Sequence, residues 1–155
     1  MIADTHIPEV AEKVPDEALK RFEGVDMILH AGDLVSLDVL KQLNSIAKTV
    51  AVYGNMDYSA ARSSLPEKTV VEAGKYKIGL THGGGAPWDI VERVRAEFEH
   101  VDAIVFGHTH QPLNESIDGI LFFNPGTPTD LRFSSKQSIG IIETGDDIKG
   151  RIIEL

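Results

Sequence analysis

Cysteine is absent from the 155-residue chain. The absence excludes a disulfide scaffold, a zinc-thiolate module and an enzyme with a cysteine nucleophile. A chain of this length buries ~70% of the surface that its unfolded form exposes, so it needs no disulfide or structural metal to stay folded. We therefore expect one domain over residues 1–155, with no sign of an oxidising compartment.

Basic residues are also scarce: 15 Lys and Arg stand against 24 Asp and Glu, a formal charge of −9. This balance argues against tight binding to long nucleic acids, and a phosphate substrate would need local positive charge. No apolar run approaches the ~20 residues of a membrane span. Residues 1–4 lack the cationic region of an export signal, so we expect a cytoplasmic protein with no membrane partner.

Short Val- and Ile-rich runs alternate with helical patterns through the first two thirds of the chain, which predicts an α/β fold. Helices are predicted from Pro15, which suits a first helical position, and from Ser36, a predicted N-cap. Pro87 opens a third helical pattern over 88–98, and aromatic residues at helical positions, such as Trp88, are expected in the core or in an interface. Strands are predicted near 26–30, 49–53, 69–72, 77–81 and 102–106.

After Gln111 the pattern changes to strand-like runs separated by turns, which predicts antiparallel hairpins. We therefore expect a parallel sheet followed by a second, antiparallel layer packed on it. No linker interrupts the chain.

Five apolar, strand-like runs each end in a residue able to bind a metal. Carboxyl ends of parallel strands meet at one edge of a sheet, so these side chains should converge. Within two of the segments the polar residues are two positions apart and can point the same way. The residues are Asp4, His6, Asp33, Asn55, His82, His108 and His110.

Seven nitrogen and oxygen donors are more than one tetrahedral ion can use, and the lack of sulfur excludes thiolate-selected metals. Two divalent ions fit better. A shared aspartate could bridge ions ~3.5 to 4 Å apart, an arrangement used in phosphoryl-group displacement. Manganese, nickel, iron and zinc all accept imidazole and carboxylate ligands.

The ordered motifs resemble the calcineurin-like metallophosphoesterase superfamily, and within it the YfcE-like small phosphodiesterase branch. The resemblance spans nearly the whole chain and implies a mixed β-sandwich of two packed sheets flanked by helices. The motifs are Asp4-x-His6, Gly32-Asp33, Gly54-Asn55-x-Asp57, Thr81-His82-Gly83 and Gly107-His108-Thr109-His110.

The resemblance implies a role for each motif residue. One metal is bound by Asp4, His6 and His110, the other by Asn55, His82 and His108, with Asp33 as the bridge. The implied reaction is hydrolysis of a small phosphate ester, most simply a phosphodiester, by a metal-bridging hydroxide. Arg132, in a loop that resembles a segment near the family's active site, either orients a phosphate or is a surface charge.

Two departures from the family pattern stand out. Met56 occupies the place where the superfamily often has a histidine that protonates the leaving oxygen, so Asp57 is a candidate substitute acid and otherwise supports the metal ligands. Only residues 1–3 precede Asp4, so the first strand is expected to be short.

Other functions stay open. The small retromer subunit is similar in fold but has lost metal-binding histidines and works as a protein-binding surface. A phosphomonoesterase or a nuclease acting on nucleic acid ends is a further alternative, and a homo-oligomer is possible. The seven retained ligand positions favour the enzyme.

Overall fold

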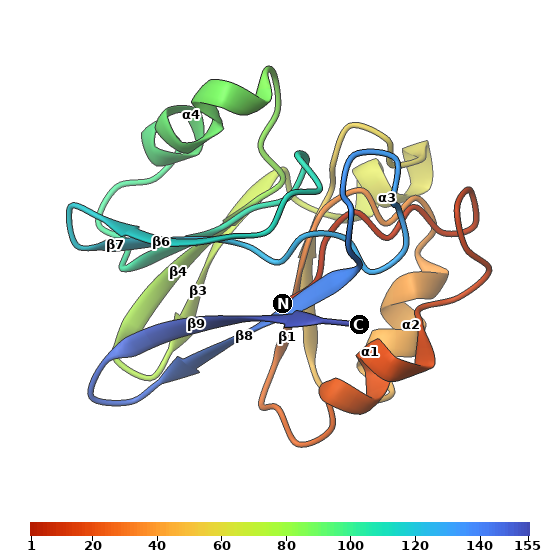
Figure 1. The fold of residues 1–155 in the computed structure, drawn as a ribbon, viewed down its shortest axis with the longest axis horizontal. Coiled ribbons are helices and arrows are strands. Elements are labelled where there is room, and N and C mark those ends of the chain that lie inside the picture. The colour runs from red at the N-terminus through yellow and green to blue at the C-terminus, as the bar shows by residue number, and fades with distance from the viewer.

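The computed structural model describes residues 1–155 (Figure 1). In chain order its elements are α1 (Asp16–Arg21), β1 (Ile28–Ala31), α2 (Asp38–Asn44), β2 (Thr49–Val52), α3 (Ser59–Ser64), β3 (Lys68–Ala73), β4 (Tyr76–Thr81), the 3-10 turn η1 (Pro87–Asp89), α4 (Ile90–Ala96), β5 (Ala103–Val105), β6 (Leu113–Ile117), β7 (Ile120–Asn124), β8 (Ser138–Thr144) and β9 (Ile148–Glu154).

The first β-layer is assembled from distant parts of the chain. β1 pairs with β2 in parallel, and β8 pairs with β9 antiparallel. Residues 1–3 join the two pairs: the Ile2 N–H donates to the Leu29 carbonyl, and the Gly140 N–H donates to the Met1 carbonyl. These three residues form only a single bridge, between Ile2 and His30, and not a regular strand.

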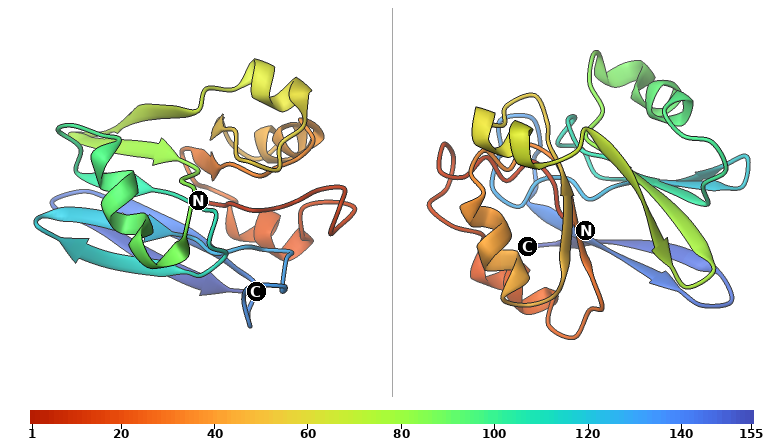
Figure 2. Two further views of the ribbon diagram at one scale, coloured as in Figure 1. Left: turned by 90° about the horizontal axis from the view of Figure 1, so that it is seen from above. Right: turned by 180° about the vertical axis from the view of Figure 1, so that it is seen from behind.

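The second layer is a five-stranded mixed sheet in the order β3-β4-β5-β7-β6. β4, β5 and β7 run parallel, whereas β3 and β6 flank them as antiparallel edges. The two layers pack face to face over a core that includes Leu29 and Val52 from one layer and Leu80, Val105 and Phe123 from the other. The architecture is therefore the expected sandwich of two sheets with helices on its outer faces, as the two orientations in Figure 2 show.

The predicted strands exist, but their assignment to one parallel sheet followed by an antiparallel layer is wrong. β1 and β2 lie in one layer, while β4 and β5 lie in the other. β3 and β4 are joined by Gly74 and Lys75 alone, and Gly74 has φ +62°. A connection this short makes a hairpin, because parallel strands need a crossover of a dozen or more residues. Likewise β7 returns into the sheet beside β5 and does not start a new layer.

Helices cover both outer faces. Phe22, just after α1, and Val39 and Leu43 of α2 pack under the first layer, while Val94 of α4 packs with Phe98 on the second. No helix has the length and apolar character needed to cross a membrane.

Three local predictions shift in the structure. Pro15 is the N-cap of α1 rather than its first residue. α2 begins one residue late, at Asp38 after Leu37, although the Ser36 hydroxyl still accepts the Asp38 N–H at 3.2 Å. Trp88 is 85% exposed and so is not in the core, because it lies in η1, a short turn with no buried residue.

Loops from both layers meet at one edge of the sandwich. The Gly107 N–H, after β5, donates to the His82 carbonyl, after β4. Gly32, after β1, has φ +87°, and a Cβ there would lie 2.7 Å from the His82 ring. Glycine therefore lets the two layers close at this edge. The predicted ligand motifs lie on these loops.

Candidate metal centre

All seven predicted ligand residues reach this edge. Asp4 and His6 follow residues 1–3, and the others follow one of four strands, from both layers. The strands and their residues are β1 with Asp33, β2 with Asn55, β4 with His82, and β5 with His108 and His110.

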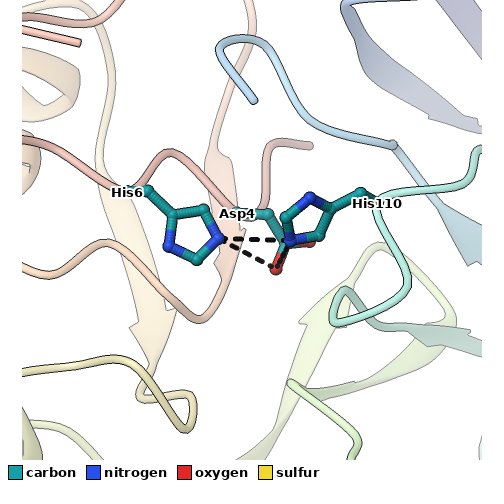
Figure 3. A group of neighbouring side chains, drawn as sticks. All are labelled: Asp4, His6 and His110. Atoms are coloured by element: carbon teal, nitrogen blue, oxygen red, sulfur yellow. Dashed lines mark hydrogen bonds and ion pairs between the residues drawn. The ribbon is translucent and has the colours of Figure 1, made fainter. Parts of the chain in front are cut away.

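One group consists of Asp4, His6 and His110, whose side chains point toward one another (Figure 3). The Nε2 atoms of His6 and His110 are 3.2 Å apart. The Asp4 carboxylate lies 3.5 Å from His110 Nε2 and 4.0 Å from His6 Nε2. All three residues are buried. Two imidazoles and a carboxylate thus surround a point where one divalent ion would find three ligand atoms.

A second group lies beside the first. His82 Nε2 is 3.2 Å from Asp33 Oδ2 and 3.1 Å from Asn55 Oδ1. The same amide oxygen is 3.0 Å from His108 Nδ1. Asp4 belongs to this group as well, since its carboxylate lies near the carboxylate of Asp33 and the imidazole of His82. Asp33 Oδ2 is also 3.9 Å from His6 Nε2. Asp33 and Asp4 thus each lie close to residues of both groups.

The backbone is strained where these residues sit. Five of the seven have positive φ, between +45° and +70°, a region that costs non-glycine residues of order 1–3 kcal/mol each and that clusters at functional sites. The chain bends sharply after each strand and turns the side chain into the site. The five are Asp4, His6, Asp33, His108 and His110.

Two imidazoles are oriented by backbone carbonyls. His82 Nδ1 lies 2.8 Å from the Ala31 carbonyl, and His108 Nε2 lies 2.9 Å from the Gly85 carbonyl. A carbonyl oxygen only accepts, so each of these nitrogens carries a hydrogen. The opposite nitrogen of each ring faces the Asn55 amide oxygen. Such backbone anchoring is the usual way in which a metal-binding histidine is held.

The charges at the site favour a cation. Burial raises the pKa of Asp4 to about 8 and lowers the pKa of His110 to about 4. Burial also lowers the pKa of His82, but the hydrogen bond with Asp33 and the charge of Asp4 outweigh it and raise that pKa to about 9. Asp4 therefore tends to hold a proton where no cation neutralises it. Burial also raises the pKa of Asp33, but the hydrogen bond with His82 and the charge of that ring outweigh it and keep this pKa below its usual value.

The residues fit divalent metal ions. His110 Nδ1 is buried and has no hydrogen-bond partner, and its Nε2 faces another imidazole nitrogen across 3.2 Å, where at most one of the two can donate. A divalent ion between the two nitrogens would bind both of them as acceptors at once. Nitrogen and oxygen ligands without sulfur suit manganese, iron, nickel or zinc.

Asp57 lies behind the ligands. Its Oδ2 accepts the N–H groups of Asp33 at 3.0 Å and Gly54 at 2.6 Å, and its Oδ1 accepts that of Val35 at 2.5 Å. The carboxylate therefore ties the loop after β1 to the loop after β2. Gly54 allows this close approach, because a Cβ there would lie 2.2 Å from Asp33 Oδ1.

Arg132 reaches the cavity at the site and is paired. Its Nε and Nη2 donate to the carboxylate of Asp130 at 2.6 to 3.0 Å. Asp130 is fully buried, with its Oδ2 3.6 Å from His110 Nδ1 and 3.9 Å from His6 Nε2. We did not predict a role for Asp130 from the sequence. The sequence feature that could have pointed to Asp130 is its position two residues before Arg132, in a loop that contains Thr127 and Thr129.

The two other notable histidines lie outside the ligand groups. His30 is buried, with its Nε2 3.1 Å from the hydroxyl of Thr5, the residue between Asp4 and His6. His100 is exposed. Five of the seven ligand residues line a cavity of about 610 Å³, together with Met56, Arg132 and Phe133. The five are His6, Asp33, Asn55, His108 and His110. A second cavity, of about 570 Å³, lies away from the site and is lined mostly by apolar side chains such as Met27 and Ile78.

Comparisons with known proteins agree with this geometry. Residues 1–147 match the family described as the calcineurin-like phosphoesterase superfamily domain. A probable metallophosphoesterase of Methanothermobacter thermautotrophicus is 33% identical over 155 residues, which cover 99% of this chain and 90% of that protein. A phosphodiesterase of Methanocaldococcus jannaschii is 27% identical over 93% of this chain and 91% of its own length.

Two solved structures of differently described proteins share the fold of this chain. An archaeal phosphodiesterase superposes with a TM-score of 0.78 at 28% identity, over 99% of this chain and 97% of that one. Vps29 from Entamoeba histolytica, in complex with zinc, superposes with a TM-score of 0.76 at 25% identity, over 99% and 96%. The same fold therefore occurs in a phosphodiesterase and in a vacuolar protein sorting subunit.

Proposed function

Because the chain belongs to the calcineurin-like phosphoesterase superfamily, we propose that it is a metal-dependent phosphodiesterase with two divalent ions at the edge of the sandwich. The observation that carries the proposal is the convergence of seven nitrogen- and oxygen-bearing side chains from both layers. A relative and a solved structure that are each described as a phosphodiesterase support the diester as substrate.

Each ligand residue has a place in this proposal. Asp4, His6 and His110 hold one ion, and Asn55, His82 and His108 hold the other. Asp33 is shared, in keeping with the position of its Oδ2 between the imidazoles of His82 and His6. Divalent ions held by these residues would supply two kinds of chemistry, a lowered pKa of bound water and stabilisation of charge on the phosphoryl oxygens. The chain itself provides rigid orientation, since backbone carbonyls and strained loops fix the ligands.

Arg132 is placed to bind the substrate. Nε and Nη2 are occupied by Asp130, which leaves Nη1 for a non-bridging phosphate oxygen in the cavity. A guanidinium held on one side by a carboxylate is pre-oriented and loses little freedom when it binds an anion. Beyond the metals, it provides the positive charge that a chain of net charge −9 otherwise lacks at this site.

Neither Met56 nor Asp57 is arranged to donate a proton to the leaving group. Met56 is 51% exposed and carries no acidic hydrogen, and its backbone N–H donates to Asp33 Oδ1 at 2.7 Å. Asp57 uses both oxygens on backbone N–H groups. Neither side chain is arranged to protonate a leaving oxygen, so Asp57 acts as a positioning residue.

The test is hydrolysis by metal-stripped protein to which manganese, nickel, iron or zinc is returned in turn. Substrates are an aryl diester, an aryl monoester and a cyclic nucleotide. We expect metal-dependent hydrolysis with preference for diesters, abolished in His108→Ala and unchanged in His100→Ala, an exposed histidine outside the site.

A second candidate is a protein-binding scaffold, which the likeness to Vps29 favours. In that case the wild-type protein binds metal but hydrolyses none of the three esters. Faster turnover of the monoester would instead identify a phosphomonoesterase.

A further inference from the structure

Two of the exposed apolar side chains, Met56 and Phe133, line the cavity at the candidate site. Only eight large hydrophobic side chains of the chain are exposed, and five of them lie on the loops that carry or flank the ligands. Isolated exposed apolar residues need no explanation, but Met56 and Phe133 share one cavity with polar side chains, which is a feature of binding sites. The five are Met56, Tyr58, Trp88, Leu131 and Phe133.

Phe133 is the member closest to the chemistry. Its ring centroid is 5.4 Å from that of His110 in an edge-on arrangement, and the residue is 63% exposed. The side-chain amide of Gln111 donates to the Phe133 carbonyl and so ties this residue to the ligand loop. The ring is held beside the metal site with much of its surface still free.

The cavity is larger than a phosphate group requires. Its volume of about 610 Å³ lies within the ~300–1,000 Å³ range of sites that bury a whole small molecule. The ligand residues and Arg132 account for the phosphate end, while the remainder is lined by Met56, Pro87, Thr109, Gln111 and Phe133. An aromatic ring and a thioether both make favourable contacts with a flat, polarisable group.

Charge limits the ligand further. Arg132 is the only Lys or Arg side chain that lines the cavity, and the chain carries a net charge of −9. A polyphosphate or a long nucleic acid would meet repulsion from the acidic protein that the single charge of Arg132 does not offset. A single phosphate ester is the anion that the site suits.

We propose that the cavity binds a phosphate ester whose organic group is a planar aromatic ring of the nucleobase type, stacked on Phe133. The inference rests on the proposed function only for the position of the phosphate, and it names the class of substrate for that same site.

A direct binding measurement tests the proposed stacking on Phe133 and does not require turnover of a diester. Metal-loaded protein is titrated calorimetrically with adenosine monophosphate and with ribose 5-phosphate, which share the sugar phosphate and differ in the base. We expect the wild-type protein to bind the nucleotide roughly 5- to 150-fold more tightly, the range for one aromatic stack. Phe133→Ala should remove that preference and leave ribose 5-phosphate binding unchanged. Val70→Ala, an exposed apolar residue outside the site, is the control.

Equal affinity for the two ligands in the wild-type protein overturns the inference, and so does a loss of both in Phe133→Ala. If neither ligand binds the metal-loaded protein, the exposed apolar side chains serve another purpose, such as contact with a protein, and the inference also fails. A nucleotide preference without ester hydrolysis would refute the proposed function while leaving the binding site in place.

Discussion

Asp57 offers the sharpest test of how the site is held. Three backbone N–H groups, from Asp33, Val35 and Gly54, donate to its buried carboxylate. Hydrogen bonds to a charged group contribute about 1.5–3 kcal/mol each. Their sum, about 4.5–9 kcal/mol, is an upper bound, because such contributions are not additive. In Asp57→Asn one carboxylate oxygen becomes an NH₂ group that faces an N–H group.

We expect Asp57→Asn to lower the free energy of unfolding by about 2.5–6 kcal/mol, the sum of about 1.5–3 kcal/mol for one lost charged hydrogen bond and about 1–3 kcal/mol for a buried donor left without a partner. Urea denaturation of metal-free protein measures it. Metal affinity should fall as well, because the loops of Asp33 and Asn55 are no longer tied together. Asp118→Asn makes the same chemical change on an exposed turn and is the control. If Asp57→Asn kept the stability and metal affinity of the wild-type protein and lost only turnover, this reasoning would be refuted. Asp57 would then be identified as a proton donor.

Other consequences can be measured separately. Manganese at 100 times its dissociation constant should stabilise the protein by about 2.7 kcal/mol and raise Tm by roughly 5–11 °C in calorimetry, whereas no shift would contradict a metal site. Gly54→Ala, whose Cβ would lie 2.2 Å from Asp33 Oδ1, should weaken metal binding, while Gly145→Ala, with open space around its Cβ, should not. Asp130→Asn should lower metal affinity ~10–100-fold by releasing an imidazole, and unchanged calorimetric binding would refute that role. With Met56 unable to donate a proton, aryl diesters should be cleaved ~10²–10⁴-fold faster than alkyl diesters, and equal rates would point to another acid.

The chemistry of the site could be predicted from the sequence because it depends on residue types and on local order. Asp, Asn and His after short apolar runs identify the carboxyl ends of strands, which meet at one edge. The alternation of Asp4 with His6, and of His108 with His110, is a local pattern as well. All seven residues reach that edge in the structure, and their role as metal ligands stays a prediction.

The arrangement of the strands could be predicted only in part. Short apolar runs identify strands, but the choice of partner depends on which faces bury most apolar surface together. The hairpin of β3 and β4 could have been recognised from its two-residue connection. The insertion of residues 1–3 between β1 and β8 could not, because it pairs Met1 with Gly140, at the far end of the chain.

Sequence alone thus determined which atoms are available to bind cations and in what order the strands present them, because both follow from side-chain chemistry and from near neighbours. Only the tertiary structure decided that Asp57 ties two loops together, that buried Asp130 lies beside His110, and that Trp88 remains exposed. These three outcomes depend on contacts between distant segments, and such contacts are set by how the two layers pack.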